Sequence, residues 1–241
     1  MRLQTLHAAI IDLDGTMVDT MGDFVVAINL MLRDIGLSPV ERPVVETRVG
    51  KGSEHLVNSI LNHALRHEIR PLFAINSVAN ENMNASLLFD AALASYQLHY
   101  RAINGQHAAV YPGVVDGLRG LQRAGFKLAC LTNKPLAFAQ ALLGLKGLNE
   151  FFPLVFGGDS FARKKPDPLP LLKTCEALGV PPAHCLVVGD SSNDAQAARA
   201  AGCPVLLVTY GYNHGQPVRG VDADGFLDSL AETTKGLAPP L

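Results

Sequence analysis

Residues 8–16 read AAIIDLDGT, and this stretch decides the fold that the sequence predicts. The apolar run Ala8–Ile11 has no polar face, which is typical of a strand buried on both sides in a parallel sheet. Asp12 then falls at the carboxyl end of that strand, where open α/β sheets bind their ligands. Asp12 and Asp14 repel one another unless a cation or a shared proton compensates them. Capping of the next helix would explain one of these acids, but not both with Gly15 behind them.

The composition is that of a globular chain of 241 residues, long enough for one large domain or for a domain with a smaller one inserted. Hydrophobic residues make up 48% and charged residues 17%, which excludes a disordered chain. The net charge is −2 without a basic run, so nucleic acid is not expected as a partner. The apolar stretches are too short for a signal peptide or a membrane span, and no membrane partner is expected.

The four cysteines, Cys130, Cys175, Cys185 and Cys203, form no CxxC pair. This pattern predicts buried thiols rather than disulfides or a zinc site. Together with the absence of a targeting segment, it favours a cytoplasmic protein.

Residues 20–105 give helical signals and no convincing strand. Apolar residues recur at helical spacing in three stretches, 24–35, 56–65 and about 79–103. Pro39 and Pro43 predict a turn or a short break, and segment 66–80 predicts no definite element. We therefore expect a separate helical domain over residues 20–105.

After Tyr111-Pro112-Gly113, short apolar strands alternate with helices. The predicted strands cover 126–131, 154–156, 185–188 and 205–208, with 226–227 as an edge strand. The predicted helices cover 114–124, 136–145, 168–178 and 195–201, with a short helix near Leu230. This alternation predicts right-handed βαβ crossovers and a parallel sheet with helices on both faces. The expected fold is α/β, with a Rossmann-like core of residues 1–19 and 106–241 and an inserted helical domain.

Small polar groups follow the predicted strands: Asp12, Thr132, Asp159 and Asp190. Because the carboxyl ends of parallel strands lie along one edge of a sheet, we expect these side chains to converge. Asp12, Asp14 and Asp190 offer oxygen ligands in the number that magnesium takes from protein. Asp194 follows Asp190 by four residues and adds an acid that could orient a ligand or water.

Two further groups point to an anionic ligand. Thr132 precedes a helix whose free N–H groups favour an anion, and Lys165 brings a cation near the same edge. A carboxylate, a metal, a cation and hydrogen-bond donors around a small dianion suit phosphoryl transfer through an aspartyl phosphate. Each residue alone has an ordinary explanation, since Thr132 and Asp190 could cap helices and Lys165 could be a solvated lysine. Their joint position at strand ends favours a site.

Four segments resemble the motifs of the haloacid dehalogenase-like hydrolases, in order and at family-like spacing: Asp12-Leu13-Asp14-Gly15-Thr16, Thr132-Asn133, Lys165-Pro166 and Gly189-Asp190-Ser191-Ser192-Asn193-Asp194. The resemblance covers nearly the whole chain, and residues 20–105 are similar to the family's mobile cap. Four details look most like the phosphoglycolate phosphatases of that family: YPG at 111–113, TNKP at 132–135, KPDP at 165–168 and GYNHG at 211–215.

The resemblance implies a catalytic role for three residues. Asp12 would be the nucleophile that takes the phosphoryl group. Asp14 would protonate the leaving oxygen and then act as base for the water that hydrolyses the acyl phosphate. Lys165 would neutralise charge on Asp12 and on the phosphate.

The resemblance also implies a magnesium site and a phosphate site. The carboxylates of Asp12 and Asp190 and the backbone carbonyl of Asp14 would ligate Mg²⁺, with Asp194 in support. The hydroxyl of Thr132 and the backbone N–H of Asn133 would bind phosphate oxygens, in addition to Lys165. No organic cofactor is expected.

A helical cap would shield the acyl phosphate from bulk water. The loop Arg48-Val49-Gly50-Lys51-Gly52 places a lysine between two glycines. We hypothesise that Arg48 and Lys51 reach into the closed site and bind a small anionic substrate. The alternative is a solvated loop lysine.

The sequence thus predicts a magnesium-dependent phosphatase for a small phosphate monoester, and the resemblance implies 2-phosphoglycolate. One alternative is a sugar phosphomutase of the same fold, which returns the phosphoryl group to another hydroxyl. A second alternative is a non-catalytic protein that binds phosphometabolites, which the complete set of motif residues disfavours. The expected partner is a small-molecule phosphate ester, and the chain is expected to be a monomer or a homodimer.

Overall fold

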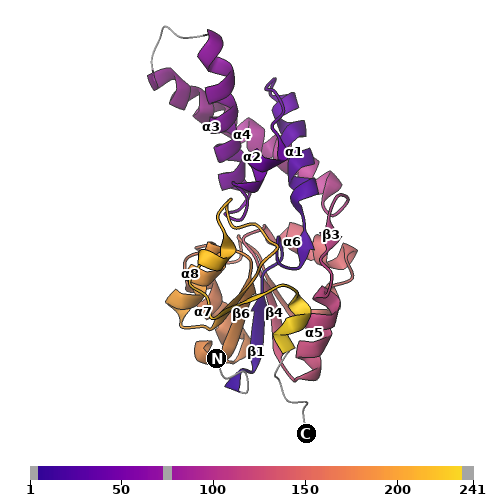
Figure 1. Ribbon diagram of the computed structural model, residues 1–241. Coiled ribbons are helices and arrows are strands. Elements are labelled where there is room, and N and C mark those ends of the chain that lie inside the picture. Colours follow the sequence, from indigo (N-terminus) through magenta and orange to yellow (C-terminus); the bar gives the residue numbers. More distant parts are fainter. Residues whose placement is uncertain (1–4, 73–77, 235–241) are drawn as a thin grey trace.

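The computed structural model describes residues 5–72 and 78–234, with the side chains of residues 67–87 outside the description. It has two parts, a sheet flanked by helices and a group of four helices at one end of that sheet (Figure 1). The sheet has six parallel strands in the order β5-β4-β1-β6-β7-β8. These strands are β1 (Ala8–Ile11), β4 (Lys127–Leu131), β5 (Leu154–Phe156), β6 (Cys185–Gly189), β7 (Val205–Val208) and β8 (Gly225–Leu227). The predicted α/β architecture is confirmed.

Strand β1 lies in the middle of the sheet because its side chains are apolar on both faces. Its register pairs Ile11 with Cys130 of β4, and all four of its residues are buried. Ala9 and Ile11 pack into the hydrophobic cluster on one face, and Ala8 and Ile10 pack into the cluster on the other. The alternation of side chains along a strand therefore fills two cores from one short segment.

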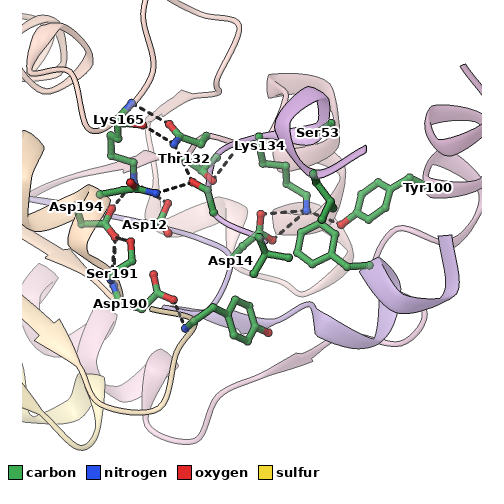
Figure 2. A pocket seen from close by; sticks show the side chains of 18 of the residues that line it. Asp12, Asp14, Ser53, Tyr100, Thr132, Lys134, Lys165, Asp190, Ser191 and Asp194 are labelled. Atoms are coloured by element: carbon green, nitrogen blue, oxygen red, sulfur yellow. Dashed lines mark hydrogen bonds and ion pairs between the residues drawn. The ribbon is translucent and has the colours of Figure 1, made fainter. Parts of the chain in front are cut away.

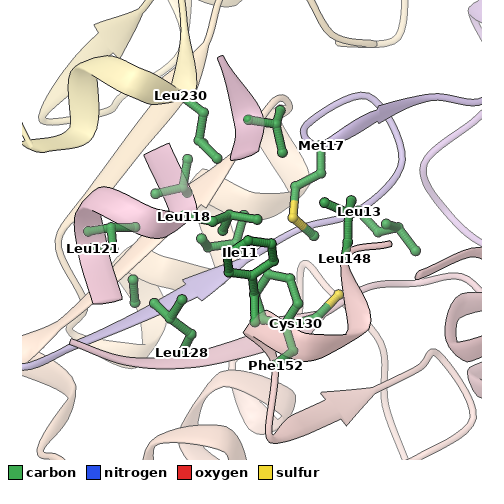
Figure 3. Packing of buried hydrophobic residues seen from close by; sticks show 14 of the residues in the cluster. Ile11, Leu13, Met17, Leu118, Leu121, Leu128, Cys130, Leu148, Phe152 and Leu230 are labelled. Carbon is green, nitrogen blue, oxygen red and sulfur yellow. The ribbon is translucent and has the colours of Figure 1, made fainter. Parts of the chain in front are cut away.

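Helices cover both faces of the sheet (Figure 1). One face carries α5 (Val114–Arg123) and α6 (Leu136–Leu145), and the other carries α7 (Leu169–Leu178) and α8 (Ser192–Ala201). Figure 3 shows the first face, where Leu118 and Leu121 of α5 lie beside Ile11 and Leu128. On the second face, α8 presents alanines to the sheet, and their small side chains allow close packing.

The four remaining α-helices form what we call the helical insert: α1 (Met21–Asp34), α2 (Arg42–Glu46), α3 (Ser53–Leu72) and α4 (Val78–Ile103). It has its own hydrophobic cluster, in which Tyr100 stacks on Phe24 and on Tyr96. The chain leaves and re-enters the sheet part through β2 (Val18–Asp19) and β3 (Ala109–Val110), which pair antiparallel. The two connections therefore lie side by side.

Short 3-10 helices complete the chain: η2 (Asn149–Phe151), η3 (Pro182–His184), η4 (Val218–Gly220) and η5 (Leu230–Thr234). The sequence predicted a turn or a short break at Pro39 and Pro43, and Pro43 lies in the first turn of α2. Proline fits there because its φ angle suits a helix and its missing N–H has no helical partner. Helix α3 extends to Leu72, into segment 66–80, and residues 73–77 of that segment lie outside the described residues.

All four cysteines are free and buried. The Sγ atoms of Cys175 and Cys203 lie 3.9 Å apart. Within the described ranges, no helix combines the length and the apolar character that crossing a membrane requires.

Candidate active site

A cavity of about 40 Å³ lies between the carboxyl edge of the sheet and the helical insert (Figure 2). The structure brings seven of the predicted site residues to its wall: Asp12, Asp14, Thr132, Asn133, Lys165, Asp190 and Asp194. The insert contributes mainly apolar and aromatic side chains, including Phe24, Leu56, Tyr96 and Tyr100. The sheet edge therefore supplies the charged groups of the cavity, and the insert supplies most of its apolar wall.

Three carboxylates meet at the charged end. One oxygen each of Asp12, Asp190 and Asp194 lies within 4.8 Å of the others, and all three side chains are buried. Asp12 follows β1 and Asp190 follows the neighbouring strand β6, while Asp194 lies in the first turn of α8. The Asp12 N–H donates to the Val188 carbonyl at 2.9 Å, which extends the pairing of β1 with β6 into the site.

Crowding and burial disfavour the charged forms of two of these acids. Burial raises the pKa of Asp12 to about 7, against the attraction of the Lys165 ammonium. Burial also raises the pKa of Asp190 well above its usual range, and the carboxylates of Asp194 and Asp12 add to the effect. Buried carboxylate oxygens in this arrangement fit a hard divalent cation such as Mg²⁺, which would offset their mutual repulsion.

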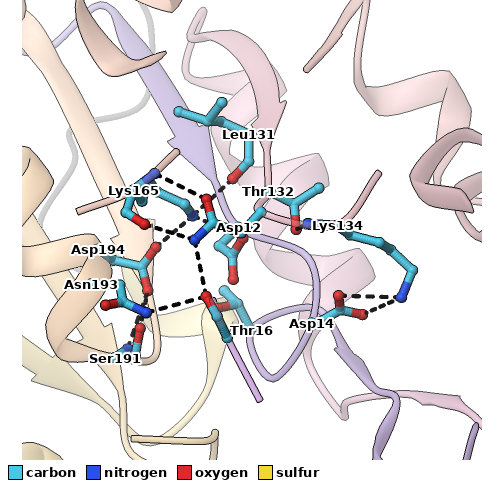
Figure 4. A network of polar contacts seen from close by, with 12 residues as sticks. Asp12, Asp14, Thr16, Leu131, Thr132, Lys134, Lys165, Ser191, Asn193 and Asp194 are labelled. Carbon is cyan, nitrogen blue, oxygen red and sulfur yellow. Dashed lines mark hydrogen bonds and ion pairs between the residues drawn. The ribbon is translucent and has the colours of Figure 1, made fainter. Parts of the chain in front are cut away.

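Lys165 lies between two of the carboxylates (Figure 4). Its Nζ donates to Asp12 Oδ1 at 2.9 Å, to Asp194 Oδ1 at 2.6 Å and to the Leu131 carbonyl at 3.0 Å. These three bonds use all three N–H groups of the ammonium. Burial alone would lower the pKa of Lys165, but Asp12 and Asp194 outweigh it and raise that pKa. The same ammonium lowers the pKa of Asp194, although burial acts in the opposite direction.

Asp194 serves the helix and the site with different oxygens. Its Oδ2 accepts hydrogen bonds from the Ser191 hydroxyl at 2.8 Å and from the Ser191 N–H at 3.2 Å, at the start of α8. Its Oδ1 binds Lys165. Helix capping and a place in the site are therefore compatible for this residue.

Gly15 permits the close approach of the first motif to Asp190. Its φ is +81°, and a Cβ at this position would lie 2.2 Å from Asp190 Oδ2. Asp190 is fixed further by the Tyr212 N–H, which donates to its Oδ2 at 2.5 Å. Only glycine fits this backbone.

Lys134 is a site residue that the sequence reasoning missed. Its Nζ lies 3.0 Å and 3.2 Å from the two carboxylate oxygens of Asp14, and 2.5 Å from the Tyr100 hydroxyl. The N–H of Lys134 donates to the Thr132 hydroxyl at 3.2 Å. Its position two residues after Thr132 was a signal in the sequence, but one that did not reveal a partner 120 residues away.

Arg48 and Lys51 do not line the cavity. The Arg48 guanidinium donates to the Val44 carbonyl at 2.6 Å and lies 3.3 Å from His63 Nδ1, on the outer side of the insert. Lys51 is exposed and lines an outer groove beside Glu54. In this conformation neither side chain reaches into the cavity, and their contact with substrate stays a prediction.

The backbone of the loop explains this outcome. Gly50, with a φ of +99°, turns its carbonyl toward the sheet part. That carbonyl accepts hydrogen bonds from Asn133 Nδ2 at 2.9 Å and from Asn193 Nδ2 at 3.1 Å. The loop thus contacts the site through a main-chain oxygen, while the Lys51 side chain points to solvent.

Asp159 is the one strand-end group that lies apart from the cavity. Its Oδ1 accepts from the Leu136 N–H at 2.8 Å and so binds the first turn of α6. For this residue the ordinary capping role is the one observed.

Comparisons with known proteins agree with this geometry. The family model described as haloacid dehalogenase-like hydrolase matches residues 6–202. The chain is 42% identical to the phosphoglycolate phosphatase of Thiobacillus denitrificans over 227 residues, which cover 94% of this chain and 93% of the relative. It is 41% identical to the phosphoglycolate phosphatase of Nitrosospira multiformis, over 95% of each chain. A crystal structure from Haemophilus somnus, described as a predicted phosphoglycolate phosphatase, superposes with a TM-score of 0.85 at 30% identity and covers 96% of this chain and 97% of its own.

Proposed function

Since the chain belongs to the haloacid dehalogenase-like hydrolases, we propose that it is a magnesium-dependent phosphatase that hydrolyses 2-phosphoglycolate through an aspartyl-phosphate intermediate. One observation carries the proposal: Asp12 lies at the carboxyl end of the central strand, bound to Lys165 and grouped with Asp190 and Asp194. This arrangement supports a nucleophile, a cation and a metal-binding group of carboxylates in one buried place. The names of the relatives support the choice of substrate.

In the first proposed step, a carboxylate oxygen of Asp12 attacks the phosphorus, and the bond from phosphorus to the ester oxygen breaks. Asp14 lines the same cavity and gives its proton to the departing ester oxygen. In the second step, Asp14 takes a proton from water as that water attacks the phosphorus. The bond between phosphorus and Asp12 then breaks, which releases inorganic phosphate and restores the carboxylate.

Other residues of the chain bind and orient the phosphate. The Thr132 hydroxyl and the Asn133 N–H would donate to its oxygens, and Lys165 would balance charge on the phosphate and on Asp12. Asp12, Asp190 and the Asp14 carbonyl, with Asp194 in support, would hold Mg²⁺. Bound there, Mg²⁺ supplies positive charge that stabilises the charge developing on the transferred group.

We further propose that residues 20–105 act as a cap on a core of residues 1–19 and 106–241. The small cavity suits a small ester, and its apolar wall from the insert supports exclusion of water from the acyl phosphate. Arg48 and Lys51 would act on substrate only in another arrangement of the loop.

The test is phosphate release from 2-phosphoglycolate with Mg²⁺ and with a chelator, beside β-glucose 1-phosphate, pyridoxal phosphate and p-nitrophenyl phosphate. We expect magnesium-dependent release that favours 2-phosphoglycolate and falls at least about a thousandfold in Asp12→Asn, because the amide cannot replace the nucleophile. Release from the other esters alone would reject the substrate. Conversion of β-glucose 1-phosphate to an isomer without free phosphate would indicate a phosphomutase, and no turnover of any ester would overturn the proposal.

A further inference from the structure

Two cations lie among the described residues that line the cavity, Lys165 and Lys134. The ammonium of Lys165 has all its N–H groups engaged by Asp12, Asp194 and the Leu131 carbonyl. The roles proposed above use Lys165 but leave Lys134 without a function. Its charge therefore calls for a separate explanation.

The ammonium of Lys134 is held away from water. The side chain is 2% exposed, and its Nζ lies 4.9 Å from the centre of the Phe24 ring and 4.6 Å from that of Tyr100. Its polar side-chain partners are the Asp14 carboxylate and the Tyr100 hydroxyl. Electrostatic attraction is stronger in such a site than in water, so the ammonium is well placed to discriminate charged from neutral ligands.

Lys134 lies at the opposite end of the cavity from Lys165. Figure 2 shows Asp14 between the group around Asp12 and the pair formed by Lys134 and Tyr100. Thr132, which faces the proposed phosphate position, is only two residues before Lys134, so at most about 7 Å of backbone separates them. A ligand whose phosphate contacts Thr132 therefore needs only a short chain to bring its other end to Lys134.

Tyr100 provides a second donor at this end. Its hydroxyl oxygen accepts the hydrogen bond from Lys134, which leaves the hydroxyl hydrogen to donate elsewhere. Burial raises the pKa of Tyr100 well above its usual range, so the hydroxyl keeps its hydrogen. An ammonium and a hydroxyl side by side match the two oxygens of a carboxylate.

We propose that Lys134, assisted by Tyr100, binds the carboxylate of a short phosphorylated acid and thereby sets the preference of the enzyme for anionic over neutral phosphate esters. This inference rests on the proposed function, because it assigns the non-phosphate end of the substrate of that same site. The substrate carboxylate shares the Lys134 ammonium with Asp14 or displaces Asp14 from it. A neutral ester of equal length makes no such contact, so its kcat/KM is lower.

The test compares kcat/KM for 2-phosphoglycolate and for 2-hydroxyethyl phosphate, which has a hydroxymethyl group in place of the carboxylate. We expect Lys134→Met to reduce the ratio of the two values about 10- to 100-fold, the range for a hydrogen bond to a charged group. Lys134→Arg keeps the charge and should retain most of the preference. Tyr100→Phe should lower the ratio about 2- to 10-fold, as expected for loss of one hydrogen bond.

Lys173→Met is the matched control, since it removes an exposed lysine of α7 that does not line the cavity, and it should leave the ratio unchanged. A purely structural role of Lys134, such as holding Asp14 in place, would lower both kcat/KM values equally and would overturn the inference. A change of ratio in Lys173→Met instead of Lys134→Met would also overturn it. Lys134→Met could be inactive with both esters, and the ratios in Lys134→Arg and Tyr100→Phe then decide. An unchanged ratio in Tyr100→Phe together with a lost preference in Lys134→Arg would reject the carboxylate site.

The two proposals fail in different ways. If the wild-type protein hydrolyses neither ester, the proposed function fails and the inference fails with it. If the wild-type protein hydrolyses 2-phosphoglycolate but the Lys134 and Tyr100 variants show the same ratio of the two kcat/KM values as the wild type, only the carboxylate site is rejected.

Discussion

The Nδ2 amide of Asn133 donates a hydrogen bond to the carbonyl of Gly50, 2.9 Å away, although 83 residues separate the two in sequence. The same amide group donates to the Lys165 carbonyl at 2.8 Å, and the Lys165 N–H returns a bond to Asn133 Oδ1 at 3.0 Å. Asn133 thus links the helical insert to the backbone that carries Lys165. Asn193, in the first turn of α8, donates to the same Gly50 carbonyl at 3.1 Å, so a loop and a helix of the sheet part contact one atom of the insert.

Asn193→Ala should weaken the closed position of the insert, because it removes one of the two hydrogen bonds to Gly50. The expected result is a fall in kcat/KM of about fivefold, as for a hydrogen bond worth about 1 kcal/mol. Steady-state kinetics with 2-phosphoglycolate would measure it. Glu54→Gln is the control, since it breaks the exposed ion pair of Lys164 with Glu54 across the same boundary, and such pairs contribute little. A larger effect in the control than in Asn193→Ala would contradict the prediction.

Gly15→Ala should destabilise the fold and abolish activity, since its Cβ would lie 2.2 Å from Asp190 Oδ2 on a backbone with a φ of +81°. Gly36→Ala separates the effect of the close contact from the effect of the positive φ. Gly36 has a similar φ of +76°, but nothing lies within 4 Å of a Cβ there. We expect a cost of about 1 kcal/mol for Gly36→Ala from backbone strain alone and a clearly larger cost for Gly15→Ala. Urea unfolding would measure both, and equal costs would show that the contact with Asp190 relaxes freely.

Lys165→Met should lower the free energy of unfolding by about 3–5 kcal/mol, because it leaves two buried carboxylates without their cation. The side chain of Lys165 is 5% exposed, whereas that of its neighbour Lys164 is 35% exposed. Lys164→Met is therefore the matched control and should change stability by less than about 1 kcal/mol. Adding Asp194→Asn to Lys165→Met should recover part of the loss, since the two residues are in contact. No recovery in the double variant would argue against their pairing.

The stability of the metal-free protein should fall as the pH rises from about 4 to about 7. An unfolded Asp has a pKa of about 3.9, whereas burial raises the pKa of Asp12 to about 7 in the fold. Between these values the native state binds more protons than the unfolded state, so the free energy of unfolding decreases with pH. The loss of stability that comes from ionising Asp12 is complete above about pH 7. Melting temperatures in chelator from pH 4 to 8 should show a steeper fall for the wild type than for Asp12→Asn.

Magnesium should oppose this loss, because a divalent cation favours the ionised carboxylates. We expect Mg²⁺ to raise the melting temperature of the wild type at pH 8 more than at pH 5, and to have little effect on Asp190→Asn. An equal magnesium effect in the wild type and in Asp190→Asn would contradict the assignment of Asp190 to the metal.

The sequence by itself predicted the sheet. The apolar run of β1, the glycines and the alternation of strands with helices are local features, and each element depends chiefly on its neighbours in the chain. The grouping of Asp12 and Asp190 followed from one general rule, that parallel strands end at a common edge. Asp194 followed from its position four residues after Asp190, one helical turn away. Pro43 was not assigned to a helix because a proline predicts a turn and a first helical turn equally well.

Only the tertiary structure decided which side chains face the end of the cavity where Lys134 lies. Lys134 meets Asp14 and Tyr100 because α4 lies over the loop after β4, and these partners are 120 and 34 residues away. The turn at Gly50 directs a carbonyl to the site and the Lys51 side chain to solvent, an orientation that the two glycines around Lys51 did not reveal in the sequence. Local sequence determines where a strand or a helix forms, but the direction of a loop side chain depends on packing between segments that are far apart in the chain.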